Sequence, residues 1–384
     1  MYGALLIDAL RRLAGELPAT PLGQKLEFFG VGGDRMRAAG CDTAVDAKDL
    51  AVVGIAEILG HLPKIWGLFH KLIAEADRRK PDLAIVIDSP AFNWRVARQM
   101  HKRGIAVVYY VCPQFWAWRQ GRVRLLRKYV NKALVIFPFE EQFYRDRGVD
   151  ATFVGHPLAD LPRPEIDRAA YGRRHQVDPA RPWIALMPGS RVKEVRMNLP
   201  GILESAARLG PAYEFLLPVA PTLDRTFLQS LIQQSAIADP PAIRLVPEAV
   251  PALAQSHAGI VASGTATVEA AMMGTPFVMV YRVSPLTYRL GRPRVKVPYF
   301  AMVNLIAGEE VVPELVQQDF NAENVVTRLN EILVDGPARN KMIAGLAAVK
   351  ARLCGPTDQG RHPVDRAAQA VMSVWESAVV SKSS

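Results

Sequence analysis

The chain has 384 residues, of which 50% are hydrophobic and 22% charged, and this is the composition of a globular protein long enough for two domains. No run approaches the roughly 18 apolar residues of a membrane span, and the 3 cysteines are scattered without metal-ligand spacing, so the sequence predicts neither a membrane-spanning protein nor a zinc site. A net charge of +10 favours an anionic partner, but charge alone does not choose among nucleic acid, phospholipid headgroups and a phosphorylated substrate.

The N-terminal segment predicts a helix with no strand before it. Residues 2–14 have a helical pattern, whereas a doubly wound α/β domain normally opens with a strand. Either the sheet begins differently, or the first strand of the domain is missing. The segment also lacks a basic region and a small-residue cleavage site, so we expect no signal peptide and a cytoplasmic protein.

Three glycines follow a predicted strand in FFGVGGDRM, residues 28–36. A dinucleotide fingerprint would need its last glycine where Arg35 stands. The segment therefore indicates a tight turn between a strand and a helix, and not a nicotinamide site.

An amphipathic segment, residues 55–73, carries one apolar stripe with Lys64 and Lys71 beside it. We expect Pro63 to break the segment into two helices, because proline removes a helical N–H. Such a stripe packs on a protein core or lies in a membrane interface. Tryptophan beside lysine favours the interface, with these residues in contact with lipid: Ile58, Leu59, Leu62, Ile65, Trp66 and Phe69.

Short apolar strands then alternate with helical patterns through both halves of the chain, as in LAIVID at 83–88 and WIALMPGS at 183–190. This alternation is typical of parallel sheets covered by helices on both faces. A segment rich in proline and charge, 159–182, separates the two series. We predict two doubly wound domains, 1–164 and 165–355, and a helical tail at 356–384.

Asp88 follows the strand LAIVI directly, so it lies at a carboxyl end, where ligands of such sheets bind. It either caps the helix expected to begin near Phe92 or faces the ligand. Trp116 and Trp118, after a later strand, either line the same cleft or belong to the core. His156, near the predicted domain junction, is expected to be a hinge or packing residue.

Two turns in the second half predict an anion site. Gly189, Ser190 and Arg191 stand where a strand ends and a helix begins, and the free N–H groups there suit a diphosphate. Ser190 alternatively caps the helix.

The second turn, in VASGTATVEAAMMGTP, supplies further backbone and hydroxyl donors from Ser263, Gly264, Thr265, Ala266 and Thr267. Glu269 is predicted in the first turn of the following helix. A capping box does not explain it, because Ala266 stands where that motif needs Ser or Thr. A carboxylate there could accept both ribose hydroxyls of a nucleotide, and two such turns fit a nucleoside diphosphate.

A basic segment, 282–300, holds five cations and no acid. It is either a solvated face or a surface for anionic headgroups or a substrate phosphate. Its cations are Arg282, Arg289, Arg292, Arg294 and Lys296.

In order along the chain, the motifs resemble those of the lipid A disaccharide synthases, bacterial glycosyltransferases of the GT-B fold. They include GVGGDRM, IDSPAFN, CPQFWAWRQGR, FVGHPLAD, LMPGSR, ASGTATVEAAMMGTP and YRVSPLTY. The resemblance implies two Rossmann-like domains facing a cleft and transfer of a sugar from UDP-2,3-diacylglucosamine to 2,3-diacylglucosamine 1-phosphate, at the inner membrane surface. It also implies a homodimer that exchanges its C-terminal helices.

The resemblance assigns roles to residues as well. Asp88 matches the general base, Arg191 and Asn304 match other residues needed for activity, and Ser263 to Glu269 match the UDP pocket. Two departures are that Ala91 stands where the family usually has a second acid, and that the family's N-terminal strand and GE-x-SGD loop are absent. No Asp-x-Asp pair lies beside the diphosphate turn, so we expect no metal or other cofactor.

Two rival interpretations remain at this stage. A UDP-N-acetylglucosamine 2-epimerase would share the UDP pocket without needing an entry for lipid. A basic nucleic-acid-binding protein would spread its cations and aromatic residues along one face, whereas here the cations concentrate in one segment, so we expect no nucleic acid partner.

Overall fold

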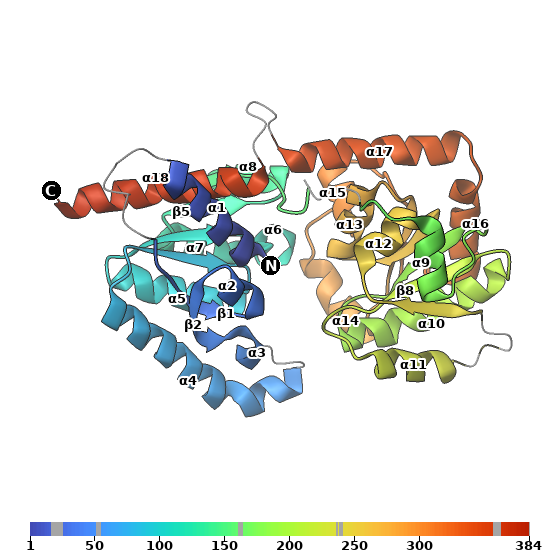
Figure 1. Ribbon diagram of the computed structural model, residues 1–384, viewed down its shortest axis with the longest axis horizontal. Coiled ribbons are helices and arrows are strands. Elements are labelled where there is room, and N and C mark those ends of the chain that lie inside the picture. The colour runs from blue at the N-terminus through green and yellow to red at the C-terminus, as the bar shows by residue number, and fades with distance from the viewer. Residues whose placement is uncertain are drawn as a thin grey trace. The chain divides into compact units, whose positions relative to one another are not determined.

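The computed structural model describes residues 1–16, 26–50, 55–159, 164–235, 237, 241–355 and 362–383. It divides into two compact units, Met1–Asp160 with Leu353–Ser384, and Leu161–Arg352 (Figure 1). The second unit thus ends three residues before the predicted boundary at 355, and the predicted tail belongs with the first unit.

Unit 1 contains two parallel sheets, one of two strands and one of four in the order β3-β4-β5-β6. The strands are β1 (Phe28–Gly32), β2 (Cys41–Asp46), β3 (Leu83–Ile87), β4 (Ala106–Tyr110), β5 (Lys132–Val135) and β6 (Ala151–Phe153). The helices are α1 (Tyr2–Glu16), α2 (Asp34–Ala38), α3 (Ala47–Leu50), α4 (Ile55–Arg79), α5 (Pro90–Lys102), α6 (Phe115–Trp118), α7 (Val123–Tyr129), α8 (Pro138–Arg145) and α18 (Pro363–Ser383), with a 3₁₀ turn at Gln120–Arg122.

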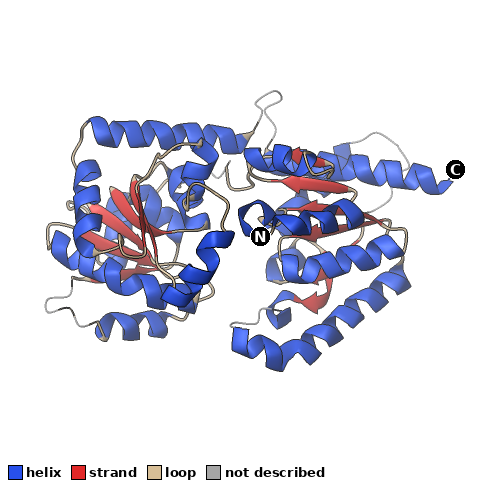
Figure 2. Ribbon diagram, turned by 180° about the vertical axis from the view of Figure 1, so that it is seen from behind, coloured by secondary structure: helices blue, strands red, loops and turns tan. Residues whose placement is uncertain are grey.

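Unit 2 is built on one parallel sheet of six strands in the order β12-β11-β10-β7-β8-β9. Helices surround this sheet (Figure 2). The strands are β7 (Trp183–Met187), β8 (Glu214–Pro218), β9 (Ile243–Val246), β10 (Ala258–Ala262), β11 (Phe277–Tyr281) and β12 (Glu314–Val316). The helices are α9 (Arg168–His175), α10 (Val192–Leu209), α11 (Arg225–Gln233), α12 (Ala249–Gln255), α13 (Thr265–Met273), α14 (Pro285–Gly291), α15 (Met302–Ala307), α16 (Ala322–Leu333) and α17 (Pro337–Cys354), with a 3₁₀ turn at Arg292–Arg294.

The central strands are buried on both faces, as continuous apolar runs predict. Every residue of β8 and β10 is buried, and four of the five residues of β4 are. Strands that are apolar on both sides need helices on both faces, and the strand–helix alternation of the sequence supplies them. The predicted pair of doubly wound α/β domains is therefore confirmed.

Helix α18 packs on unit 1 of its own chain, against α1 and beside β4 and β5. Its buried face consists of small and medium side chains, among them Ala367, Ala368 and Val371. Arg12 of α1 donates to Asp365 over 2.7 Å and ties the two helices at the surface. The last helix thereby covers the first.

A cavity of about 540 Å³ separates the two sheets of unit 1. It is lined by Phe29, Gly30 and Val31 of β1 and by Leu83–Ile87 of β3. Among the described strands, β1 pairs only with β2, and β3 pairs only with β4, so each leaves one edge open. Among the described residues the two sheets of unit 1 therefore remain separate.

The predicted break at Pro63 is wrong, because α4 runs without interruption from Ile55 to Arg79. Proline removes one backbone N–H but leaves the rest of the helical ladder, and the amphipathic face of a long helix supplies the remaining stability.

Candidate nucleotide-sugar site

The two predicted anion turns lie next to each other in unit 2. They follow β7 and β10, which are neighbouring parallel strands with Val261 opposite Met187. From β7 the chain continues to β8 on one side, while β10 lies on the other, so the strand order reverses here. The crevice at such a switch point, outside the carboxyl ends of the strands, is where doubly wound sheets bind ligands.

The first turn depends on Gly189. Its φ of +119° is unfavourable for residues with a side chain, and an added Cβ would lie 2.8 Å from Cβ of Glu194. The turn leads to Arg191, which is the N-cap of α10 by backbone conformation and makes no side-chain cap bond. Ser190 is therefore not the helix cap, and the alternative role weighed for it is wrong.

Glu194 holds the donors of this turn together. Its carboxylate accepts from the backbone N–H of Ser190 at 3.1 Å and from Nη1 of Arg191 at 2.5 Å. A negative group thus already lies at the N-terminus of α10, where the exposed N–H groups and the helix dipole favour one. Glu194 is not among the residues predicted from the sequence, although an acid three residues after Arg191 in the first turn of a helix is a readable signal.

Glu194 also lies close to Tyr281, at the end of β11. Burial raises the pKa of the Tyr281 phenol, and the charge of Glu194 raises it further. The phenol therefore stays protonated and can donate a hydrogen bond in this region.

The second turn begins at Gly264, whose φ is +138° and whose missing side chain leaves open space. Two of the predicted hydroxyl donors are already used: Oγ of Ser263 donates to the carbonyl of Phe300 at 2.8 Å, and Oγ1 of Thr267 donates to the carbonyl of Gly264 at 2.8 Å. The donors left for a ligand are the first backbone N–H groups of α13, which have no intrahelical partner.

Glu269 is the fifth residue of α13, because the helix begins at Thr265. The prediction that it lies in the first turn is wrong by one turn, and neither a capping box nor the N-terminal dipole accounts for it. Its carboxylate is half-buried and has no hydrogen bond or ion pair with any described residue, and burial raises its pKa. A half-buried carboxylate with no such bond keeps its oxygens free to accept from a ligand.

Asn304 is fully buried, and its amide is fully used. Its Nδ2 donates to the carbonyl of Val312 at 2.8 Å and to Glu314 at 2.9 Å, and its Oδ1 accepts from the N–H groups of Val311 and Val312. No donor or acceptor is left for a substrate, so the geometry gives Asn304 a positioning role in place of the catalytic one predicted.

Asn304 fixes the position of the loop beside Ser263. Glu314 accepts from the backbone N–H groups of Phe300 at 2.8 Å and Ala301 at 2.9 Å, and the carbonyl of Phe300 accepts from Ser263. Asn304 therefore acts on the second turn through Glu314 and the loop.

Asn198 is a second buried amide that the sequence analysis missed. Its Nδ2 donates to the carbonyl of Pro188 at 3.1 Å, and its Oδ1 accepts from the N–H of Arg282 at 2.9 Å. It joins the ends of β7 and β11 and so fixes the first turn. A lone amide on the apolar face of α10 was the available signal.

Asp88, in unit 1, lies at the carboxyl end of β3 in an unusual conformation. Asp88 and Ser89 both have a positive backbone φ, +49° and +44°, which residues other than glycine seldom adopt. The carbonyl of Asp88 accepts from Nδ2 of Asn93 and from the phenol of Tyr109, both at 2.7 Å, and these bonds hold the turn.

The carboxylate of Asp88 is exposed and free of hydrogen bonds within the described residues. Helix α5 begins at Pro90 with Ser89 as N-cap and has no side-chain cap bond, so the interpretation of Asp88 as a cap is wrong. Two strained residues in succession at a strand end point to a functional turn.

The predicted lipid-contact stripe divides into buried and exposed side chains. Phe69 is 5% exposed and packs on Phe92 with ring centroids 5.9 Å apart, so its assignment to lipid is wrong. Ile65 is half-buried, and Trp66 is 56% exposed. The side chains of Ile58, Leu59 and Leu62 lie outside the part of the chain that the structure describes.

The basic segment also divides. Arg282 donates to the carbonyl of Phe320 and stacks on its ring at 4.6 Å, so it belongs to the fold and not to a surface for anions. Helix α14, in contrast, exposes Leu286 at 69% and Leu290 at 54%, with Arg289 between them.

The remaining candidate residues of unit 1 are Trp116, Trp118 and His156, and they differ in burial. Trp116 is buried and donates to Glu140 at 2.8 Å, whereas Trp118 is exposed beneath Arg119. His156 is buried against Phe137, and burial lowers its pKa to about 4.

Over the described residues there is no group of His, Cys, Asp or Glu side chains arranged to hold a metal ion. Within the same residues, none of the helices is long and apolar enough to cross a membrane.

Curated relatives share nearly the whole chain. The lipid-A-disaccharide synthase of Koribacter versatilis (strain Ellin345) is 54% identical over 375 residues, which cover 97% of this chain and 95% of that protein. That of Acidobacterium capsulatum is 48% identical over 365 residues, covering 92% of this chain and 89% of that protein.

Solved structures share the fold at low identity. A putative UDP-N-acetylglucosamine 2-epimerase from Listeria monocytogenes superposes with a TM-score of 0.58 at 11% identity, over 98% of this chain and 94% of that one. The calicheamicin glycosyltransferase CalG4 does so with a TM-score of 0.56 at 15% identity, over 96% and 93%. These likenesses confirm the GT-B type of fold. The family model described as lipid-A-disaccharide synthetase matches residues 2–352, and the chain belongs to that family.

Proposed function

We propose that this chain is an inverting glycosyltransferase that makes the β-1,6-linked disaccharide of lipid A. The acceptor hydroxyl of 2,3-diacylglucosamine 1-phosphate loses its proton to a base and attacks the anomeric carbon of UDP-2,3-diacylglucosamine. The bond from that carbon to the diphosphate breaks, and UDP leaves with the electron pair. Family membership supports glycosyl transfer in lipid A synthesis.

The observation that carries the proposal is the meeting of two turns at the switch point of unit 2. The first offers the backbone and guanidinium of Arg191 to a diphosphate, and Glu194 would turn aside as the diphosphate enters. The second offers Glu269, an acceptor without a partner among the described residues, to the ribose. Lost stabilisation of a leaving group by one such donor costs about 10²–10³-fold in rate.

Asp88 is the proposed base. Its free carboxylate and strained turn suit a group held for proton transfer, and Asn93 and Tyr109 preserve that turn. We expect charge on the departing diphosphate to be stabilised by Arg191 and the helix N-termini, without an essential metal.

The protein is further proposed to work at the cytoplasmic surface of the inner membrane, where its acylated substrates reside. The exposed Trp66 in unit 1 and the pair Leu286 and Leu290 in unit 2 support this, because apolar side chains beside cations suit a lipid interface. Lys64, however, already pairs with Asp49 at 2.7 Å.

The experiment supplies purified protein with both acylated sugars and measures UDP and disaccharide together. The proposal requires equal amounts of the two products, at a rate that chelator leaves unchanged. UDP without disaccharide would indicate hydrolysis, and conversion of UDP-N-acetylglucosamine alone would indicate an epimerase.

A further inference from the structure

Unit 1 contains a long stretch of sequence in which every charged side chain is positive. From residue 89 to residue 139 there is no Asp or Glu, whereas seven Arg and three Lys residues stand there. This excess equals the net charge of +10 of the whole chain. The positive charge of the protein is therefore concentrated in the part of unit 1 that includes α5 and α7.

Helices α5 and α7 lie side by side. Both pack on the same hydrophobic core, α5 through Val96 and α7 through Val123. They also contact each other, with the rings of His101 and Tyr129 5.7 Å apart between centroids. Their outer surfaces therefore form one continuous side of unit 1.

The outer side of each helix carries a pair of cations. Arg98 and Lys102 are four residues apart on α5, and Arg124 and Lys128 are four apart on α7, so each pair shares one face of its helix. All four side chains are exposed, and none forms a hydrogen bond or an ion pair with another described residue. We call these four residues and the surface between them the α5–α7 face.

Acids of the neighbouring elements do not neutralise this face. Asp77 of α4 pairs with Arg103, with Nε and Oδ1 2.5 Å apart. Asp146 is the single acid among the described residues that line a groove of about 490 Å³, which it shares with Arg124 and two other arginines. The face therefore keeps an excess of positive charge.

Exposed tryptophans border the same helices. Trp118, ahead of α7, is 50% exposed and lies beneath the guanidinium of Arg119, 3.9 Å from its ring centroid. On the other side, the exposed Trp66 of α4 stacks on Phe69, which packs on Phe92 of α5. Tryptophan beside cations is typical of surfaces that lie among lipid headgroups.

We propose that the α5–α7 face binds the anionic headgroups of a phospholipid membrane. The inference rests on the proposed function, which brings the protein to a membrane that holds its acylated substrates. Each cation close to an anionic surface adds an attraction that salt screens. A nucleic acid would also be attracted to the charge, but the tryptophans at both borders favour lipid.

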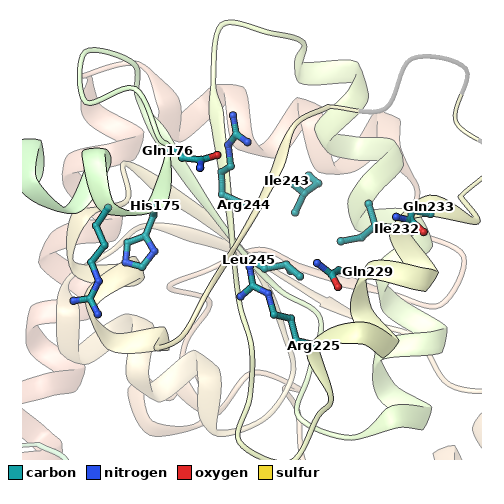
Figure 3. A pocket seen from close by; sticks show the side chains of 10 residues that line it. His175, Gln176, Arg225, Gln229, Ile232, Gln233, Ile243, Arg244 and Leu245 are labelled. Atoms are coloured by element: carbon teal, nitrogen blue, oxygen red, sulfur yellow. The ribbon is translucent and has the colours of Figure 1, made fainter.

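Unit 2 contains a second cluster of cations, which supplies the control. Arg174, Arg225 and Arg244 line a pocket of about 340 Å³ beside β9, and the described residues around it include no tryptophan. Figure 3 shows the side chain of Arg244 directed away from Arg225. Arg174 and Arg225 are exposed, so the same charge can be removed there without disturbing a core.

The test measures cosedimentation with vesicles of phosphatidylcholine, with and without phosphatidylglycerol. The wild type is expected to bind more tightly when phosphatidylglycerol is present and to dissociate as salt is raised. Arg98→Gln with Arg124→Gln should weaken this binding about tenfold or more, because two cations leave the face. Arg174→Gln with Arg225→Gln should bind as the wild type does.

Turnover of the two acylated sugars in micelles of non-ionic detergent is measured beside binding, and the double variant of the face should keep wild-type turnover there. The inference is overturned if that turnover falls, if the control variant loses as much binding, or if the wild type does not prefer vesicles with phosphatidylglycerol. Preference for duplex DNA over those vesicles would indicate a nucleic acid partner instead. Vesicle binding by a protein that makes no disaccharide would refute the proposed function alone.

Discussion

At the scale of single residues, the candidate residues of the two units differ in whether their polar side chains are free or fully used. Asp88 and Glu269 keep carboxylates without partners among the described residues, while Asn304 and Asn198 spend every polar atom on the protein. A free carboxylate at a strand end can act on a ligand, and a satisfied amide can only hold other groups in place.

Asp88→Asn is expected to lower turnover by about 10²–10⁴-fold, the usual contribution of a general base. The amide has nearly the same shape, and the turn is held by the carbonyl of Asp88 and not by its side chain, so UDP affinity should not change. Steady-state kinetics beside a UDP titration measures both. Unchanged turnover would remove Asp88 from the mechanism.

His156 is expected to make stability depend on pH. Its pKa falls from 6.5 to about 4 in the folded protein, so the unfolded chain binds more protons and stability is lost as pH drops through that window, by up to about 3 kcal/mol. Burial raises the pKa of Glu140 from 4.5 to about 7. Between these pH values the folded protein binds more protons at Glu140 than the unfolded chain does, so this residue makes stability rise as the pH drops.

Comparison of wild type with His156→Gln isolates the histidine, because Glu140 is common to both. Chemical denaturation at pH 4 and pH 7 should give a smaller acid-side loss in the variant. An identical loss in both proteins would contradict the assignment.

At the scale of elements, the loop before α15 depends on one amide. Asn304→Ala would leave the N–H groups of Val311 and Val312 and the carbonyl of Val312 without their side-chain partner, while Oε1 of Glu314 would keep the bond from Ala301. Each unsatisfied buried group costs about 1–3 kcal/mol, so we expect a marked fall in stability and a weaker grip on UDP through Ser263.

The control for Asn304 is Asn324→Ala, at a half-buried position of α16, where the side chain donates one bond to the carbonyl of Asp319 at 3.0 Å. Thermal unfolding and UDP titration of both variants separate the two cases. Equal effects would mean that the buried network has no special part.

The sequence predicts best the elements that consist of continuous apolar runs, such as the buried strands β8 and β10. The turns after β7 and β10 follow from glycine after a strand, and parallel pairing brings them together. The sequence does not give the start of α13, since Gly264 as N-cap moved Glu269 one turn inward. Nor does it show which face of α4 meets the core, because the burial of Phe69 depends on Phe92, which is far along the chain.

At the scale of the whole molecule, the chain belongs to the family of lipid-A-disaccharide synthetases, and the proposed membrane contact depends on exposed apolar side chains beside cations. Helix α14 shows two exposed leucines one turn apart, and few soluble surfaces need such a pair.

Leu286→Asp with Leu290→Asp should reduce binding to anionic vesicles about tenfold or more, because it removes apolar area and adds repulsion. Val334→Asp with Ile343→Asp, also exposed, is the control. Cosedimentation measures the fraction of protein bound to the vesicles. Equal binding by the wild type and by the two double variants would exclude α14 as a membrane contact.

The most direct test of the donor site is a calorimetric titration of UDP into wild type, Glu269→Gln and the exposed control Glu204→Gln. The account predicts that Glu269→Gln weakens UDP binding about tenfold, since the ribose hydroxyls lose a charged acceptor, while Glu204→Gln binds as wild type does. Wild-type affinity in Glu269→Gln would contradict the placement of the nucleotide at these two turns.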